Sequence, residues 1–175
     1  MLKEIENKVA GFRTTRIVEV LDDTFRNTKK KYLVIEWIEG EKLNYFSQKK
    51  LKKAFFSNEI DFIRMMLILL YQLQHLHSKN VVHRDIRPDN IIYSEINNQV
   101  YFVLIDFGSS FVMNCDPPCF IVQIYSKHFS PPELNNRDLL CDKCDIYSLS
   151  ATLHLLLYTM EGFKFLFFIF FFKFI

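Results

Sequence analysis

The chain has 175 residues, half of them hydrophobic, and carries 22 Lys and Arg against 20 Asp and Glu. A chain of this length and composition is able to bury a core, which excludes a disordered protein. The near balance of charge excludes an acidic tail and the basic surface typical of nucleic-acid binding, so we expect one globular domain without a nucleic-acid partner.

The N-terminal part of the sequence predicts one helical segment and two strands. Residues 1–11 are rich in Glu and Lys and have apolar residues four apart, which indicates the end of a helix. Residues 17–21 and 32–35 are rich in β-branched and aromatic side chains, which predicts two strands. The polar stretch 22–31 between them predicts a turn.

Two helices are expected next. Residues 43–56 form the first, and Asn58 caps the second. The second helix carries apolar residues at a helical period, dense enough that we expect most of the helix to be buried. These residues are Ile60, Ile63, Leu67, Leu70, Leu73 and Leu76.

From Val81 onward the pattern is that of short strands. Val81–Val82, Ile91–Tyr93 and Val100–Ile105 are expected to be strands, and Asn97-Asn98 predicts a tight hairpin turn. Residues 145–158 are again apolar at helical spacing, which predicts a further helix.

The end of the chain, residues 162–175, is a low-complexity segment rich in phenylalanine. Its uninterrupted apolar run, Phe165–Phe172, is too short for a membrane span, which needs about 20 residues. Glu161, Gly162 and Lys164 interrupt any longer run. We therefore expect no membrane association, and we regard an exposed end of this kind as an aggregation hazard.

The first residues are charged and lack the apolar stretch of a signal peptide, so we expect a cytoplasmic, reducing compartment. The cysteines then remain free thiols. The pairs Cys115–Cys119 and Cys141–Cys144 also have a spacing that fits a four-thiolate zinc site. We favour this alternative less, because the first pair flanks Pro117-Pro118 in a loop.

The residues that carry chemistry stand in four blocks. The first, a loop between two expected strands, is His83-Arg84-Asp85-Ile86-Arg87-Pro88-Asp89-Asn90. The others are Asp106-Phe107-Gly108, Pro131-Pro132-Glu133 and Asp145-Ile146-Tyr147-Ser148. In this order and spacing, the four blocks resemble the signature set of eukaryotic-type protein kinases. The resemblance extends from residue 4 to residue 158.

The resemblance implies a role for each residue of the loop. Asp85 accepts or orients the proton of a substrate hydroxyl, and Asn90 and Asp106 supply oxygen ligands to Mg²⁺. Arg87 stands where serine/threonine kinases usually have Lys, and it keeps a positive charge near the transferred phosphate. Taken singly, each aspartate is more often an ordinary turn residue, so the assignment depends on the whole constellation.

The resemblance also implies a nucleotide site. The backbone of Glu36 and Ile38 is expected to bind the adenine of ATP, and Trp37 between them is expected to serve packing. Glu6 aligns best with the helix glutamate that pairs with a nucleotide-binding lysine, although Glu4 is an alternative.

Other residues of the motifs receive structural roles from the resemblance. His83 packs under Asp106, and Asp145 is the buried aspartate that holds the backbone of the loop. Gly108 lets the backbone turn after Phe107.

Arg84 resembles the arginine that binds a phosphorylated residue in many kinases. Residues 111–124 contain no Ser, Thr or Tyr, so we expect no phosphorylation switch at Arg84. Asp116 is a candidate fixed partner, and local hydrogen bonds of Arg84 are the alternative.

The expected fold class is α+β, with a partial N-lobe sheet and a mainly helical C-lobe. We place the N-lobe remnant at 1–35, the hinge at 36–40, the C-lobe part at 41–161 and the tail at 162–175. No Gly-rich loop precedes Glu4, so we expect a kinase domain truncated at both ends that binds MgATP weakly. In the family, Glu133 pairs with an Arg from later helices.

The expected function is ATP-dependent phosphotransfer to Ser or Thr hydroxyls of protein substrates. Pro88 favours this specificity, because tyrosine kinases with an arginine at the position of Arg87 lack the proline. Ser126 also falls where the serine/threonine group has a Thr, or it is a plain loop serine. The alternatives are an inactive interaction module, an incomplete gene product, or a small-molecule kinase, which does not explain Pro132-Glu133.

Overall fold

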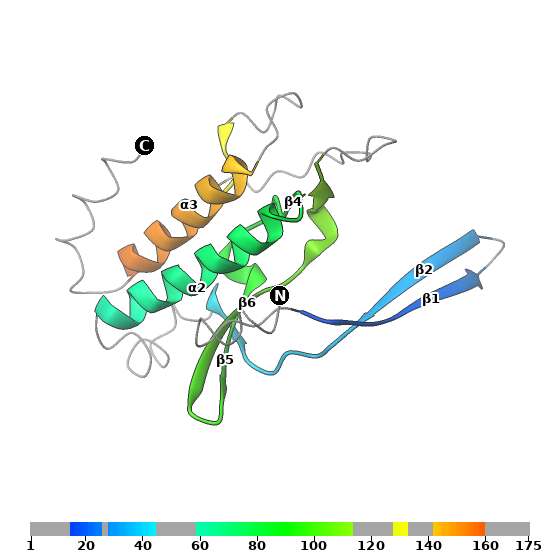
Figure 1. Ribbon diagram of the computed structural model, residues 1–175, viewed down its shortest axis with the longest axis horizontal. Coiled ribbons are helices and arrows are strands. Elements are labelled where there is room, and N and C mark those ends of the chain that lie inside the picture. Colours follow the sequence, from blue (N-terminus) through cyan, green and yellow to red (C-terminus); the bar gives the residue numbers. More distant parts are fainter. Residues whose placement is uncertain (1–14, 26–27, 45–58, 114–127, 133–141, 160–175) are drawn as a thin grey trace.

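The structure is a computed structural model that describes residues 15–25, 28–44, 59–113, 128–132 and 142–159. Within these ranges, two long helices lie side by side and small antiparallel sheets lie next to them (Figure 1). The helices are α2 (Glu59–His77) and α3 (Lys143–Thr159). The arrangement confirms the predicted α+β class with a mainly helical larger part.

The first sheet is the hairpin of β1 (Ile17–Phe25) and β2 (Thr28–Ile35), which extends away from the helices in Figure 1. Both strands reach further than predicted, so the expectation of a turn over 22–31 was wrong for most of that stretch. The polar residues support pairing because opposite charges face each other across the strands: Asp22 lies opposite Lys31, with Nζ and Oδ1 3.6 Å apart.

The second sheet has the order β3-β5-β6 and lies against α2. Its strands are β3 (Glu41–Lys42), β5 (Ile91–Ile96) and β6 (Gln99–Leu104). Asn97 and Asn98 join β5 to β6 with φ angles of 53° and 61°, the left-handed conformation that a two-residue hairpin turn requires. The predicted tight turn is therefore confirmed.

Gly40 allows β3 to approach β5. Its φ is 153°, and a Cβ atom at this position would lie 2.2 Å from the carbonyl oxygen of Tyr93. Any other residue would have to push β3 away from β5.

Two short elements flank the loop that carries the chemistry. β4 (Val81–Val82) pairs with β7 (Phe111–Val112) in a third sheet. Single turns of 3₁₀ helix, η2 (Pro88–Asn90) and η3 (Phe107–Ser109), follow β4 and β6. The predicted strands at 81–82, 91–93 and 100–105 and the predicted helix at 145–158 are all present, with small differences at their ends.

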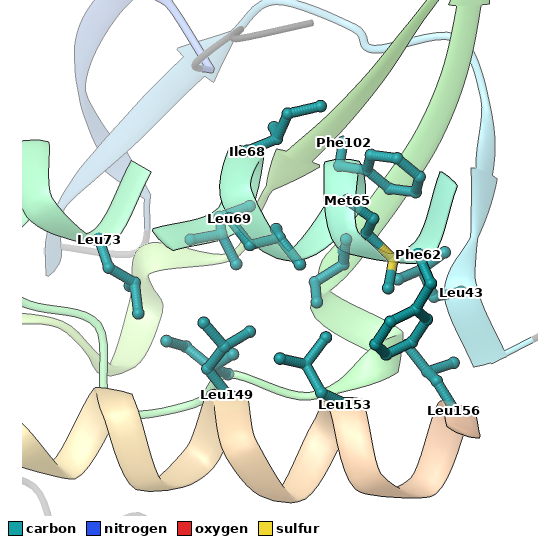
Figure 2. Close-up of a cluster of buried hydrophobic side chains, with 13 residues drawn as sticks. Leu43, Phe62, Met65, Ile68, Leu69, Leu73, Phe102, Leu149, Leu153 and Leu156 are labelled. Atoms are coloured by element: carbon teal, nitrogen blue, oxygen red, sulfur yellow. The ribbon is translucent and has the colours of Figure 1, made fainter. Parts of the chain in front are cut away.

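The core lies between α2, α3 and the β5–β6 sheet (Figure 2). Side chains from α2 and α3 point toward one another, and Phe102 of β6 and Leu43 close one end of the cluster. The α2 and α3 members include Phe62, Met65, Ile68, Leu69, Leu73, Leu149, Leu153 and Leu156, all 5% exposed or less. Burial on this scale supplies most of the driving force for folding.

The side of α2 that faces the core differs from the expected one. Ile60, Ile63 and Leu67 were expected to be buried, but 66%, 43% and 46% of their surfaces are exposed. The reason is that α2 is apolar on more than one side, and the row that begins with Phe62 and Met65 is the one that meets α3. Periodicity alone does not distinguish two apolar rows of equal spacing.

A buried glutamine joins α2 to the sheet. Gln72 is 3% exposed; its Nε2 donates to the carbonyl of Phe102, and its Oε1 accepts from the N–H of Leu104 at 3.0 Å. Both ends of the amide are therefore satisfied at the edge of β6.

Several expectations concern residues outside the described ranges. These are the N-terminal helix end, most of the expected helix at 43–56, the cap Asn58 of the helix that follows, and the phenylalanine-rich tail. Among the described helices, none has the length and apolarity needed to cross a membrane.

Prediction from the core. Replacing Leu69, which is fully buried, with alanine should lower the free energy of unfolding by about 2–5 kcal/mol, because it leaves a cavity between the helices. Leu155→Ala is the matched control on the neighbouring helix, since Leu155 is 41% exposed, and it should cost less than about 1 kcal/mol. Urea denaturation measures both values; equal losses would contradict the assignment of the core face.

Candidate functional site

The candidate site lies on the loop between β4 and β5, residues 83–90. Two buried side chains anchor the loop: Ile86, which is fully buried in the core, and Pro88, which is buried at the start of η2. Asp85, just before Ile86, and Arg87, between the two anchors, are only half-buried. The loop therefore presents its charged side chains to the surface from a rigid base.

A single carboxylate holds the backbone of this loop. Asp145, at the start of α3, is 0% exposed and accepts hydrogen bonds from the N–H groups of His83 and Arg84, both at 2.8 Å. The Nε2 of His77, the last residue of α2, lies 2.9 Å from Oδ2 of Asp145. The expected role of Asp145 is confirmed. Arg84 has a φ of 67°, and these bonds hold it in that unfavourable conformation.

Asn90 connects both ends of the loop. Its Nδ2 donates to the carbonyl oxygen and to Oδ2 of Asp85, each at 2.8 Å. Because both bonds use the amide nitrogen, the amide oxygen is the atom left to face a cation. The structure thus places Asn90 beside Asp85, and it gives the amide a second task, orienting the Asp85 carboxylate.

Asp106 is brought to the same place by the end of β6. The N–H of Ile105 donates to the carbonyl of Asn90 at 2.9 Å, so the next residue, Asp106, follows directly on this contact. Asp106 is exposed, has a φ of 65°, and accepts from the N–H of Gly108 at 3.2 Å. The left-handed backbone conformation is therefore at Asp106, whereas the turn had been expected at Gly108.

His83 has a structural role. The side chain is fully buried, its Nε2 lies 3.1 Å from the carbonyl oxygen of Ile105, and its ring packs against Phe107 at 4.8 Å between centroids. Burial lowers the pKa of His83, more strongly than the nearby carboxylates raise it. The buried ring contacts Ile105 and Phe107 on either side of Asp106, which agrees with the expected packing role of His83.

Arg87 lies between two carboxylates. Its Nε is 3.9 Å from Oδ2 of Asp85, and its Nη2 is 3.6 Å from Oδ2 of Asp89. Asp89 in turn accepts a hydrogen bond from the amide of Asn44. The Nε of Arg87 is buried and makes no hydrogen bond within the described structure, whereas 38% of the side chain as a whole is exposed.

Arg84 makes local contacts. Its Nε donates to the carbonyl of Ser109, and its guanidinium lies 5.2 Å from the ring centroid of Phe111. Burial lowers its pKa. Arg84 therefore makes a local hydrogen bond, and Asp116, the other candidate partner, lies outside the described residues.

The expected nucleotide site is described in part. The N–H of Glu36 donates to the carbonyl of Arg16 at 2.9 Å, so this N–H is bonded within the chain. Ile38 is 5% exposed. Trp37 is 87% exposed, so the expectation that it serves packing was wrong. Glu6 and its alternative Glu4 lie outside the described residues.

Other candidates also fall outside the described ranges: Ser126, Glu133, Cys115, Cys119 and Cys141. The remaining cysteine, Cys144, is buried and is present as a thiol. In the part of the chain that is described, no group of three or more His, Cys, Asp or Glu side chains is placed to hold a metal ion.

Comparison with known proteins settles the family. The family model of the protein kinase domain matches residues 1–165. The chain belongs to the protein kinase domain family. Members of this family use ATP and Mg²⁺ and act on proteins. The order of motifs that resembles protein kinases is therefore a true family signature.

Two relatives show which kinases the chain resembles. It is 34% identical over 142 residues to ribosomal protein S6 kinase alpha-1 of Rattus norvegicus, covering 80% of this chain and 18% of the relative. It is 27% identical over 157 residues to MAP kinase-activated protein kinase 2 of Drosophila melanogaster, covering 86% of this chain and 41% of the relative. The chain thus spans less than half the length of either relative.

The sequence pattern missed two residues that support the kinase loop. His77 was not singled out, although it is the third partner of Asp145. Asp89 was not singled out, although it holds Arg87 and Asn44. The signal for His77 was a titratable side chain at the end of α2, six residues before His83.

Prediction from the anchor. Asp145→Asn should lower the free energy of unfolding by about 2–4 kcal/mol, because the amide NH₂ would then face one of three donors. Hydrogen–deuterium exchange at the amides of His83 and Arg84 should accelerate more than elsewhere in the chain. Asp142→Asn, an exposed site three residues earlier, is the control and should leave both amides protected.

Proposed function

We propose that the chain transfers a phosphoryl group from ATP to Ser or Thr hydroxyls of protein substrates. The observation that carries this proposal is the constellation at residues 85–106. Asp85 is oriented by Asn90 and lies beside Arg87, on a loop that α3 holds through Asp145. A carboxylate fixed in this way suits the positioning of a hydroxyl nucleophile, which is the main demand of phosphoryl transfer.

In this proposal, each side chain has one task. Asp85 accepts or orients the proton of the substrate hydroxyl, and the Asn90 amide keeps the carboxylate in place. Arg87, whose side chain is 38% exposed beside Asp85, offers the charge of its guanidinium to a phosphate oxygen. The positions of these groups are consistent with a reaction at the exposed side of the loop.

The residues present fit Mg²⁺. Asn90 keeps its amide oxygen available, and Asp106 exposes its carboxylate next to the Ile105–Asn90 contact. One carboxylate and one amide oxygen are a typical protein contribution for Mg²⁺, which takes its other ligands from water and phosphate. When bound, MgATP supplies the phosphoryl group and the cation that neutralises its charge. The carbonyl of Glu36 and the backbone of Ile38 are the proposed contacts for adenine, and Glu6 the proposed partner of a nucleotide-binding lysine.

The proposed division of the chain follows these assignments. Residues 1–35 belong to the N-lobe, 36–40 to the hinge and 41–161 to the C-lobe, and residues 162–175 form a separate tail. Pro88 supports Ser and Thr specificity by its position in the motif, and a cytoplasmic location suits the thiol of Cys144.

Prediction from the proposed function. With radiolabelled ATP and a serine peptide, Asp85→Asn should lower phosphate transfer by about 10²–10⁴-fold and leave nucleotide binding nearly unchanged in calorimetry. Asp106→Asn should instead weaken Mg²⁺-dependent nucleotide binding. Asp22→Asn on the hairpin, 73% exposed, is the matched control.

The outcomes of this assay separate the alternatives. If Asp85→Asn retained most of the transfer rate, Asp85 would lose its assigned role. If the unaltered chain bound no nucleotide and transferred no phosphate, the reading as a non-catalytic interaction module would replace the proposal.

A further inference from the structure

α2 carries a second apolar row on the side that does not meet the core. Ile60, Ile63, Leu67 and Tyr71 are 66%, 43%, 46% and 42% exposed and follow one another at spacings of three and four residues. Residues at these spacings form one continuous strip along a helix. Exposed apolar strips of this length mark interaction sites on folded domains.

A groove between α2 and α3 continues this row. It has a volume of about 590 Å³ and is lined by residues of α2 and of the segments next to it and to α3: Leu67, Leu70, Tyr71, Gln74, His77, Ser78, Asp142 and Ile146. Ile146 is itself 43% exposed. A groove with mostly apolar walls and one acidic end suits apolar side chains followed by a cation.

The direction of α3 relative to α2 determines where the segment that follows α3 leaves the helix pair. At one end of the helix pair, His77 of α2 meets Asp145 of α3; at the other end, Phe62 of α2 and Leu156 of α3 lie in the same cluster (Figure 2). The helices are therefore antiparallel. The end of α3 at Thr159 lies near the start of α2, where the exposed row begins.

The sequence after α3 has the composition that the row and groove require. Eleven of the thirteen residues from Phe163 to Ile175 are apolar, and the other two are Lys164 and Lys173. Exposed carboxylates stand at both ends of the row, at Glu59 and at Asp142.

The lengths agree as well. From Glu59 to His77, α2 rises about 27 Å at 1.5 Å per residue. The nine steps from Lys164 to Lys173 cover about 30 Å in an extended chain. The two lysines are therefore able to reach the two acidic ends at the same time.

We propose that residues 163–175 dock in cis along the exposed row of α2 and into the α2–α3 groove, with Lys164 near Glu59 and Lys173 near Asp142. The covalent connection through α3 favours this occupant over a separate molecule, because it gives the segment a millimolar effective concentration at the groove. Docking also covers the apolar strip and the phenylalanines at once, which removes two aggregation-prone surfaces.

Photo-cross-linking of the full chain tests this proposal. Phe168 is replaced by p-benzoylphenylalanine, light and ¹⁵N-labelled chains are mixed in equal amounts, and the cross-linked peptides are mapped by mass spectrometry after irradiation. We expect cross-links within one chain, to Leu67, Leu70, Tyr71 or Gln74. Cross-links between light and heavy chains would make a second copy the occupant, and cross-links only to the β1–β2 hairpin, or none, would also overturn the proposal.

A matched pair of variants strengthens the test. Leu67→Glu places a charge in the groove and should lower the cross-link yield at least about tenfold. Ile17→Glu, on the hairpin and 64% exposed, should leave the yield unchanged. Both sites are exposed, so both variants should keep the circular dichroism of the parent chain. No nucleotide is needed, so the result is independent of phosphotransfer.

Discussion

The buried carboxylate of Asp145 is the interaction on which the site depends. A charge without solvent is tolerated only when donors replace the water, and here three donors do so: two backbone N–H groups of the loop and the ring of His77. The same contact therefore satisfies Asp145, orders the loop and ties the end of α2 to the start of α3. Losing any one of these donors would therefore affect the burial of Asp145, the order of the loop and the connection between the two helices.

The geometry of the site consequently depends on the packing of the two helices. Asp145 is placed by α3, and α3 is placed by the leucines that meet Phe62, Met65 and Leu69. Because Asp145 binds the N–H of Arg84, the packing of that core also determines where Arg84 and the next residue, Asp85, lie. This connection explains how half-buried catalytic candidates stay fixed on a short loop with little packing of their own.

The second support of the site comes from the sheet. Gln72 holds the end of β6, and Ile105 at that end contacts both Asn90 and the ring of His83. Asp106 follows immediately, so its position depends on the β6 register and on α2. The loop and Asp106 come from different parts of the sequence, and the helix–sheet core brings them together.

The sequence predicted the elements around the site well, for physical reasons. Motif order reflects the chemistry, so Asp85, Asn90, Asp106 and Asp145 were assigned before any coordinates, and the turn at Asn97-Asn98 follows from backbone preferences. Burial was predicted less well, because a helix apolar on two sides does not reveal which row meets a partner; hence Ile60 and Leu67 were misassigned. Trp37 was misassigned because aromatic character alone does not fix exposure.

Contacts between side chains far apart in the sequence could not be predicted from the sequence. His77 and Asp145 are 68 residues apart, and Asn44 and Asp89 are 45 residues apart. No local pattern connects such pairs, since only the packing of α2 and α3, or of β3 beside η2, brings them within hydrogen-bonding distance. The roles of the supporting residues therefore emerged from the structure.

The most direct test of the central claim is a measurement of the hydrogen bonds themselves. In a chain labelled with ¹⁵N and ¹³C, scalar couplings across hydrogen bonds should connect the amide nitrogens of His83 and Arg84 with the carboxyl carbon of Asp145. Couplings at both amides would support a loop held by one buried carboxylate of α3. Their absence, with both amides exchanging as fast as those of the exposed hairpin, would contradict it.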